Sequence, residues 1–212
     1  MGFKRIVLAR ETDVDTIKEI KEQTGLDVEV FVHGSLCVSY SGQCLFSSLV
    51  GGRSGNRGAC AGSCRLPYDI VDKNNEVLND TKKYPLSMKD LCTIVSIGKL
   101  MDIGVNSFKI EGRMKSKEYV YLVTKLYRKA IDSYLDNKKV TIDYDVLDKL
   151  KKVFNREYSL GFLNNVKNND VINGKQPNNV GVKIGKVVKL TKTNALIKFE
   201  DELHINDGVR IK

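Results

Sequence analysis

One stretch decides the fold class: residues 105–134, which read VNSFKIEGRMKSKEYVYLVTKLYRKAIDSY. Residues 105–110 are predicted to form a strand, and Ser116 can then cap a long helix. The helix carries apolar or aromatic side chains along one face, at Val120, Val123, Tyr127, Ile131 and Tyr134. A strand followed by a helix is the repeating unit of an α/β fold with a parallel sheet.

The same alternation precedes this stretch. Residues 3–9 are a predicted buried strand, a helix then runs from a cap at Thr12 to Gly25, and residues 28–32 form a second strand. Three apolar side chains of the helix are expected to face the core: Val14, Ile17 and Ile20.

A further unit is predicted between these segments. Regular structure returns at residues 68–71, and Ser87 is expected to cap a helix that Gly104 closes. This helix would turn three side chains inward: Leu91, Val95 and Leu100. Only about three or four strand–helix units are present, too few for an eight-unit barrel. We therefore expect the chain to be a fragment of a longer protein.

The C-terminal part has a different pattern. Residues 1–163 form the predicted α/β unit, and the Asn-rich residues 164–179 are interpreted as a linker. Residues 180–212 are predicted to be a small, truncated β module with a turn at Thr193 and Asn194. Its alternating segments are residues 182–192, 195–200 and 209–212.

Composition narrows the class of protein. The chain has 212 residues, 42% of them hydrophobic and 29% charged, which is typical of a folded globular protein. It has no apolar run of membrane-spanning length and no secretory signal pattern, so we expect a cytoplasmic protein. The net charge is +9, and residues 138–192 contribute twelve Lys or Arg against five Asp or Glu. A nucleic-acid partner and a merely solvated lysine-rich surface both fit this charge.

Four cysteines stand out in residues 34–65, where Gly, Ser, Cys and Arg replace any periodic pattern: Cys37, Cys44, Cys60 and Cys64. In a reducing compartment, metal binding is a better expectation than disulfides. Four thiolates can hold a [4Fe–4S] cluster or a structural zinc ion. The spacing favours the cluster, because zinc sites usually pair their cysteines two to four residues apart.

Polar residues of the same loop are candidates for contacts with that cofactor. Arg53, Asn56 and Arg57 are predicted to bind it, and Arg65 would help to offset its negative charge. Cys92 is assigned to the helix predicted after Ser87 and is expected to be an ordinary core residue.

Three motifs resemble one known family. They are residues 29–47 (EVFVHGSLCVSYSGQCLFS), residues 52–65 (GRSGNRGACAGSCR) and residues 109–120 (KIEGRMKSKEYV). Together they are similar to the signature of the collagenase-like peptidases, family 32 of the unassigned-mechanism class. The resemblance covers residues 3–163.

The resemblance implies more than a peptidase. Better-understood members are RNA hydroxylases that modify a tRNA or ribosomal RNA base with prephenate as co-substrate, and their four cysteines hold an iron–sulfur cluster. The family fold is a (β/α)8 TIM-type barrel, so this chain would be the second half and its partner the missing N-terminal half. Residues 180–187 resemble the start of the β module in the ribosomal-RNA type. Many members carry a glutamine where this chain has Gly62.

Three charged residues follow the strand at residues 105–110. Lys109, Glu111 and Arg113 would lie at the C-terminal rim of such a barrel, where active sites are found. Arg113 could bind the carboxylate of prephenate or an RNA phosphate. The alternative is a structural ion pair of Glu111 with Lys109 or Arg113.

His33 lies four residues before Cys37. As a catalytic residue it could form the Cys–His pair of a peptidase, donate a hydrogen bond beside the cluster or handle a proton. Three aromatic residues flank the loop and could either stack on a base or belong to the core: Tyr40, Phe46 and Tyr68.

Three functions therefore compete. The first is an iron–sulfur RNA hydroxylase, the second a collagenase-like peptidase, and the third a non-enzymatic, zinc-stapled RNA-binding module. Under the first hypothesis, a half barrel is expected to be inactive by itself.

Overall fold

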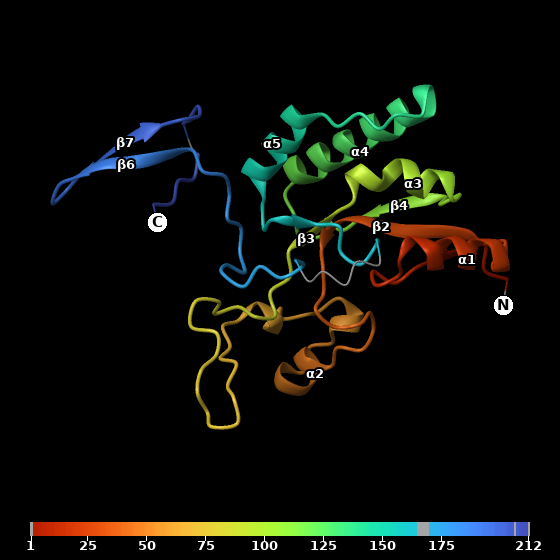
Figure 1. Cartoon of the computed structure of the whole chain (residues 1–212), viewed down its shortest axis with the longest axis horizontal. Helices are drawn as coiled ribbons and strands as arrows, with labels where there is room; N and C mark the ends of the chain where they lie inside the picture. Colours follow the sequence, from red (N-terminus) through yellow and green to blue (C-terminus); the bar gives the residue numbers. More distant parts are fainter. Residues whose placement is uncertain (1, 165–169, 206, 212) are drawn as a thin grey trace.

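The computed structural model describes residues 2–164, 170–205 and 207–211. Its body is an α/β unit around a five-stranded sheet, shown in Figure 1. The strands are β1 (Arg5–Val7), β2 (Asp27–Ser35), β3 (Asp90–Cys92), β4 (Ser107–Ile110) and β5 (Tyr158–Ser159). The α/β class predicted from strand–helix alternation is confirmed, whereas the half-barrel arrangement stays a prediction.

The sheet is mixed rather than parallel throughout. Strands β1 and β4 run parallel to β2, whereas β3 runs antiparallel to β2 and carries β5 parallel to itself. The long excursion between β2 and β3 leaves and returns at one end of the sheet, since Ser35 pairs with Asp90. With no crossover helix to carry the chain back, β3 must run in the opposite direction.

Two of the predicted helices begin and end close to the expected residues. Helix α1 (Val14–Thr24) ends at Gly25 as predicted, although its N-cap is Asp13 rather than Thr12, because the Asp13 carboxylate accepts the first free N–H groups. Helix α4 (Lys117–Asn137) is capped by Ser116, as predicted. Helix α5 (Tyr144–Val153) follows and packs on α4.

The inner face of α4 differs slightly from the prediction. Val120 is exposed, while the core face consists of Tyr119, Val123, Leu126, Tyr127, Ala130 and Tyr134. All of these side chains except Tyr134 belong to the main core together with Val28, Val30 and Val32 of β2.

The helix predicted from Ser87 to Gly104 is wrong in its first half. Residues 87–94 are all buried, which suits an interior strand better than an amphipathic helix. They contain β3, and the chain then forms a 3-10 turn at Ile94–Ser96 and the short helix α3 (Ile97–Asp102). Val95 is consequently exposed, whereas Leu91 and Leu100 are buried as expected.

Two further predicted strands are also corrected. The first strand spans only Arg5–Val7 and lies at the sheet edge, so that Phe3 is 66% exposed. Residues 68–71 form no strand; Val71 makes a single bridge to Val77.

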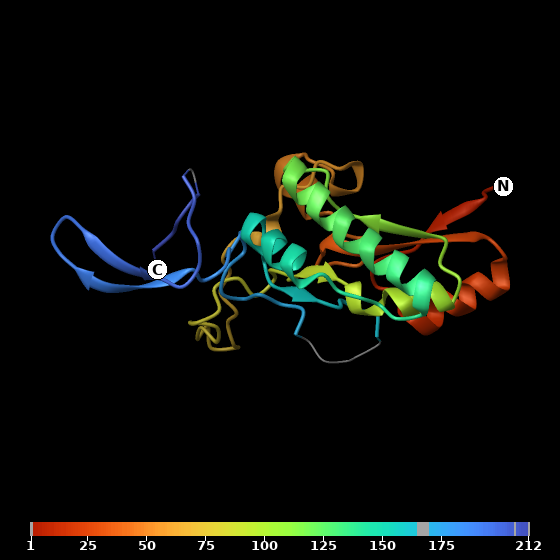
Figure 2. The same ribbon diagram turned by 90° about the horizontal axis from the view of Figure 1, so that it is seen from above.

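The C-terminal region contains a hairpin of β6 (Gly185–Leu190) and β7 (Ala195–Phe199), which projects from the body in Figures 1 and 2. Its turn includes Thr193 and Asn194, as predicted. Residues 209–211, part of the third expected strand, are not in a strand. Of the expected linker, residues 165–169 lie outside the described residues, and Asn173 is buried against the body.

Within the described part of the chain, no helix combines the length and apolarity that a membrane span requires.

Candidate functional site

The four cysteines lie on residues 36–65, here called the cysteine loop, which leaves the carboxyl end of β2 (Figure 1). The loop contains the short helix α2 (Phe46–Gly51) and two 3-10 turns. All four cysteines are free thiols, with Cys60 exposed and the others partly exposed. The loop is therefore a surface feature anchored to the sheet.

Three of the thiols act electrostatically on the fourth, Cys64. Burial raises the pKa of the Cys64 thiol most, and the neighbouring Cys37, Cys60 and Cys44 raise it further, while Arg65 opposes them. Segments 27 residues apart in the chain thus meet around Cys64. The loop folds so that thiols, rather than carboxylates, gather at one place.

Cys60 is held by hydrogen bonds within the loop. The backbone N–H of Gly62 donates to its sulfur over 3.3 Å, and the Ser47 hydroxyl lies 3.8 Å from the same sulfur. Ser47 is itself buried and accepts from the Ala61 N–H over 3.0 Å. Such N–H donors stabilise a thiolate and tune a metal bound to it.

This donor set suits a thiolate-bound cofactor in its chemistry. Four thiolates around a single zinc ion stand about 3.8 Å apart, given tetrahedral geometry and a Zn–S bond of about 2.3 Å. Among the described residues, no group of three or more metal-binding side chains is close enough to hold one ion. The described thiols therefore act on a shared region around Cys64 without forming a single-ion group.

Arg65 fastens the cysteine loop to the sheet. Its Nη1 donates to the Ser87 hydroxyl over 2.7 Å and to the Met88 carbonyl, and its Nη2 donates to the Leu36 carbonyl over 3.3 Å. Burial and the neighbouring Arg156 lower the pKa of this guanidinium. Besides its predicted electrostatic role, Arg65 joins both ends of the excursion between β2 and β3.

Two of the residues predicted to contact a cofactor form hydrogen bonds within the cysteine loop instead. Arg53 Nε donates to the Ala59 carbonyl over 3.1 Å, and Asn56 Nδ2 donates to the Gly42 carbonyl over 2.8 Å. Arg57 is exposed at the end of a 3-10 turn. Arg53 and Asn56 thus shape the loop, and a direct contact with a cofactor stays a prediction.

The charged residues at the end of β4 and just after it have separate partners. Glu111 pairs with Arg10 at 2.9 Å, and Lys109 pairs with Glu29 at 3.4 Å. Arg113 donates to the Gly58 carbonyl over 3.1 Å. The expected structural pair of Glu111 with Lys109 or Arg113 does not form in the described structure, and Arg113 instead reaches the cysteine loop.

His33 is a core residue. It is 1% exposed and its ring contacts those of Tyr119, Tyr127 and Tyr158. Burial first, and the charge of Lys115 second, lower its pKa to about 3, so it is neutral at physiological pH. The hydrogen-bond partner of its ring in the described structure is the Tyr127 hydroxyl, 3.4 Å from Nδ1, rather than a thiol of the loop.

The flanking aromatics are not core residues as a group. Tyr40 and Phe46 are 74% and 45% exposed, so the core interpretation is wrong for both, because the loop carries them outward. Tyr68 is partly buried and donates to the Ser63 carbonyl over 2.9 Å. Cys92 is buried in the core as predicted, although on β3 rather than on a helix.

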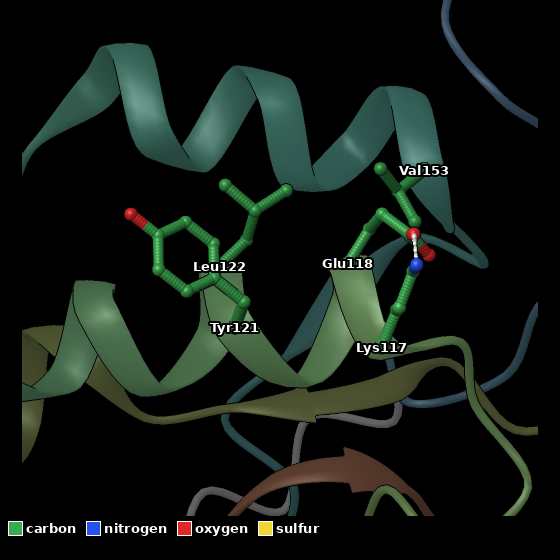
Figure 3. Close-up of a pocket in the computed structure, with 5 residues that line it drawn as sticks. All are labelled: Lys117, Glu118, Tyr121, Leu122 and Val153. Carbon is green, nitrogen blue, oxygen red and sulfur yellow. Dashed lines mark ion pairs between the residues drawn. The ribbon is translucent and has the colours of Figure 1, made fainter.

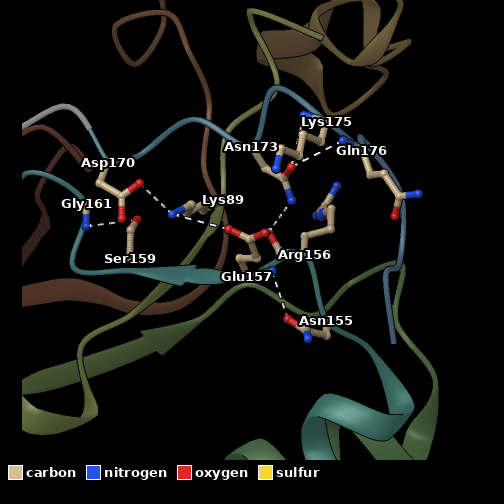
Figure 4. A network of polar contacts seen from close by, with 10 residues as sticks. All are labelled: Lys89, Asn155, Arg156, Glu157, Ser159, Gly161, Asp170, Asn173, Lys175 and Gln176. Atoms are coloured by element: carbon tan, nitrogen blue, oxygen red, sulfur yellow. Dashed lines mark hydrogen bonds and ion pairs between the residues drawn. The ribbon is translucent and has the colours of Figure 1, made fainter. Parts of the chain in front are cut away.

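Several charged residues near the loop were missed by the sequence analysis. Asp90 is fully buried at the start of β3 and pairs with Arg156 at 2.9 Å. Figure 4 shows Arg156 within a wider network, in which Lys89 joins Asp170 at 2.7 Å and Glu157 at 3.3 Å. Lys89 and Asp90, Arg156 and Glu157, and Asp170 come from three separate parts of the chain, all outside the three recognised motifs.

A second surface feature is an apolar groove, whose described lining contains no cysteine or histidine. Figure 3 shows an apolar groove between α4 and α5, lined by Lys117, Glu118, Tyr121, Leu122 and Val153. Among the described residues that line the groove, Lys117 and Glu118 form an ion pair at 3.9 Å on the same helix.

Comparison with known proteins places the chain in a family. Residues 1–173 match the sequence profile of "Peptidase family U32". The chain belongs to peptidase family U32. This match covers all four cysteines, Arg65, Lys109, Glu111 and Arg113. No solved structure matches this U32 chain.

Its U32 relatives carry two kinds of name. A "23S rRNA 5-hydroxycytidine" synthase of Escherichia coli is 37% identical over 218 residues, covering 100% of this chain and 33% of that protein. "tRNA hydroxylation protein P1" of Bacillus subtilis is 42% identical over 167 residues, covering 76% of this chain and 40% of that protein. A "Collagenase" of Porphyromonas gingivalis is 35% identical over 227 residues, covering 97% of this chain and 54% of that protein. The chain thus spans between about a third and a half of these relatives.

Proposed function

We propose that this U32 chain is part of an iron–sulfur RNA base hydroxylase. The observation that carries the proposal is the gathering of four free thiols on one loop, where they act on the pKa of Cys64 together. Relatives named for hydroxylation of ribosomal RNA and of tRNA support the substrate class. The ligands of a [4Fe–4S] cluster would be Cys37, Cys44, Cys60 and Cys64.

The cluster, when bound, would supply electron transfer or Lewis-acid chemistry. The chain's own residues would create its environment. Arg65 holds the loop against the ends of β2 and β3, and Gly62 donates an N–H to the sulfur of Cys60. Arg113 reaches the loop from the end of β4 and leaves its other N–H groups for an anionic substrate.

The fold that we propose for the whole protein is a (β/α)8 barrel of which this chain is the second half. Relatives roughly two to three times as long support this proposal, because they have room for the other strand–helix units. In this proposal the partner of the chain is the N-terminal half of the same barrel. Prephenate is the proposed co-substrate.

The hairpin supports RNA as the partner. Lys186 lies directly opposite Lys198 across β6 and β7, and the register places Lys189 on the same face. Like charges directly opposite each other destabilise a strand pair unless an anion lies between them. The face of the hairpin that carries these lysines suits an RNA phosphate backbone.

A peptidase is the weaker candidate. It would need an activated nucleophile, and the neutral His33 is enclosed by three tyrosine rings. The observation in its favour is that two relatives are named "Collagenase" and a third is named a protease. A zinc-stapled binding module is the third candidate, and metal analysis of the purified protein separates it from the cluster.

The test is anaerobic purification of the full-length protein, followed by absorbance spectroscopy and analysis of iron, sulfide and zinc. We expect a broad band near roughly 400 nm and about four irons per chain. Changing Cys37 or Cys60 to Ser should remove both, whereas Cys92→Ser should keep both. Base hydroxylation is then read by mass spectrometry of ribosomal RNA and tRNA. One tightly held zinc, or proteolysis that survives complete removal of metal, would contradict the proposal.

A further inference from the structure

A turn of the cysteine loop carries an aromatic side chain between two of the proposed cluster ligands. Residues 40–43 form this turn, in which the Gln43 N–H donates to the Tyr40 carbonyl over 3.0 Å. The Tyr40 side chain is 74% exposed. It lies three residues after Cys37 and four residues before Cys44. An aromatic ring is thus held in solvent beside the thiols.

This turn is fastened at two points. Glu11, just before α1, accepts through Oε1 from the Ser41 N–H over 3.0 Å and from the Ser41 hydroxyl over 3.2 Å. On the other side, Asn56 Nδ2 donates to the Gly42 carbonyl over 2.8 Å. The backbone that carries Tyr40 is therefore already ordered, and a partner that stacks on its ring loses less affinity to ordering the chain.

The second fastening brings two arginines to the same surface. Arg57 directly follows Asn56, is exposed, and its guanidinium has no hydrogen bond or ion pair with the described residues. Gly58 comes next, and its carbonyl accepts from Arg113 Nη2 over 3.1 Å. Arg113 is also exposed and keeps its remaining N–H groups free of hydrogen bonds to the described residues. We call Tyr40, Arg57 and Arg113 the loop platform.

The charge around the loop platform favours an anionic partner. Residues 34–68 contain three arginines and no Asp or Glu. The Glu11 carboxylate that meets the turn accepts two hydrogen bonds from Ser41. Exposed guanidinium groups suit phosphate oxygens, because their forked N–H groups bind oxygen pairs. An aromatic ring beside arginines is typical of surfaces that bind single-stranded nucleic acid, on which bases stack and phosphates pair.

We propose that the loop platform binds an unpaired stretch of RNA, with one base stacked on the Tyr40 ring and the adjacent phosphates on Arg57 and Arg113. The inference rests on the proposed function and adds the surface that holds the substrate strand. A base in a duplex is stacked on both faces, so only an unpaired or flipped base can reach the ring. The cysteine loop lies apart from the hairpin of β6 and β7 in Figures 1 and 2, so the two surfaces contact different parts of the RNA.

The test is fluorescence anisotropy of the anaerobically purified full-length protein with two labelled probes of one sequence. One probe is a single-stranded RNA of about 12 nucleotides, and the other is the same strand in a duplex. We expect Tyr40→Ala to weaken binding of the single strand at least about fivefold, because one base loses its stacking partner, and to leave duplex binding unchanged. Tyr40→Phe should keep the affinity, since the ring remains. Tyr144→Ala, 66% exposed at the start of α5, is the matched control and should have no effect.

The phosphate contacts are tested by salt dependence. Arg57→Gln should reduce the slope of log K against log salt for the single strand by about 1. Arg128→Gln, at an exposed position on α4, is the control and should keep the slope.

Three outcomes would overturn the inference. They are equal losses of affinity in Tyr40→Ala and Tyr144→Ala, equal losses for single strand and duplex, and an unchanged RNA affinity in Tyr40→Ala with an altered mass by light scattering. The last result would assign the loop platform to a protein contact. Iron content is measured on the same samples and should be unchanged in Tyr40→Ala. An iron-free unsubstituted protein would refute the proposed function, and that result is read separately from RNA affinity.

Discussion

Arg113 Nη2 donates a hydrogen bond of 3.1 Å to the carbonyl oxygen of Gly58, two residues before Cys60. The guanidinium lies so close to Gly58 that a Cβ there would be 2.8 Å from Nη1. Gly58 also has φ +79°, a conformation that other residues adopt only with strain. The end of β4 and the cysteine loop are thus joined where a side chain on Gly58 would separate them.

Gly58→Ala should therefore loosen the cysteine loop. The added methyl group would displace Arg113 and cost roughly 1 kcal/mol in backbone strain. We expect less iron per chain after anaerobic purification, with the α/β body still folded by circular dichroism. Gly52→Ala is the matched control, because Gly52 has φ +62° with no atom within 4 Å of the added Cβ. Equal iron content in the two variants would show that the Arg113 contact does not matter.

Arg65→Lys should destabilise the protein although the charge is kept. The guanidinium bonds to the Ser87 hydroxyl and to the carbonyls of Met88 and Leu36, and an ammonium cannot reproduce that fork. We expect the free energy of unfolding in urea to fall by about 1 to 3 kcal/mol. Arg53→Lys, which loses one exposed hydrogen bond, should change it by less than about 1 kcal/mol. Equal losses in both variants would contradict the anchoring role.

The buried His33 should make stability depend on pH. Burial lowers its pKa from 6.5 to about 3, so between these values the unfolded chain binds more protons than the folded one. The free energy of unfolding should therefore fall as the pH is lowered from about 6.5, by at most about 1.4 kcal/mol per pH unit. His33→Gln should lose this part of the slope, and the control His204→Gln, at an exposed position, should keep it. The measurement is urea unfolding from about pH 6.5 to about pH 5; an unchanged slope in His33→Gln would disprove the assignment.

The lysines of the hairpin should contribute to RNA affinity. Replacing both Lys186 and Lys198 by Ala should weaken RNA binding and reduce the slope of log K against log salt by about 1 to 2. Lys73→Ala with Lys125→Ala, two exposed lysines outside the hairpin, is the control. Filter binding to ribosomal RNA at several salt concentrations provides both numbers. A loss of affinity in the control equal to that in the hairpin variant would indicate a diffuse charge effect.

Local signals in the sequence were sufficient for several elements. Ser116 caps α4 and Gly25 ends α1 as predicted, because caps depend on a few neighbouring residues. The prediction failed at residues 87–94, where strand and helix are hard to distinguish in a short apolar run. The rest of the fold buries both faces of this segment, and it therefore contains the strand β3.

The sequence by itself determined the chemical inventory of the protein: an α/β unit, a loop with four thiols and an excess of positive charge. The spacing of Cys37, Cys44, Cys60 and Cys64 along one loop made their proximity predictable. Only the tertiary structure decided that Asp90 pairs with Arg156 and that His33 points into the core, since contacts between distant segments leave no periodic pattern. Which neighbours a buried polar group meets depends on how the elements pack, because the cost of burial is set by the whole environment rather than by adjacent residues.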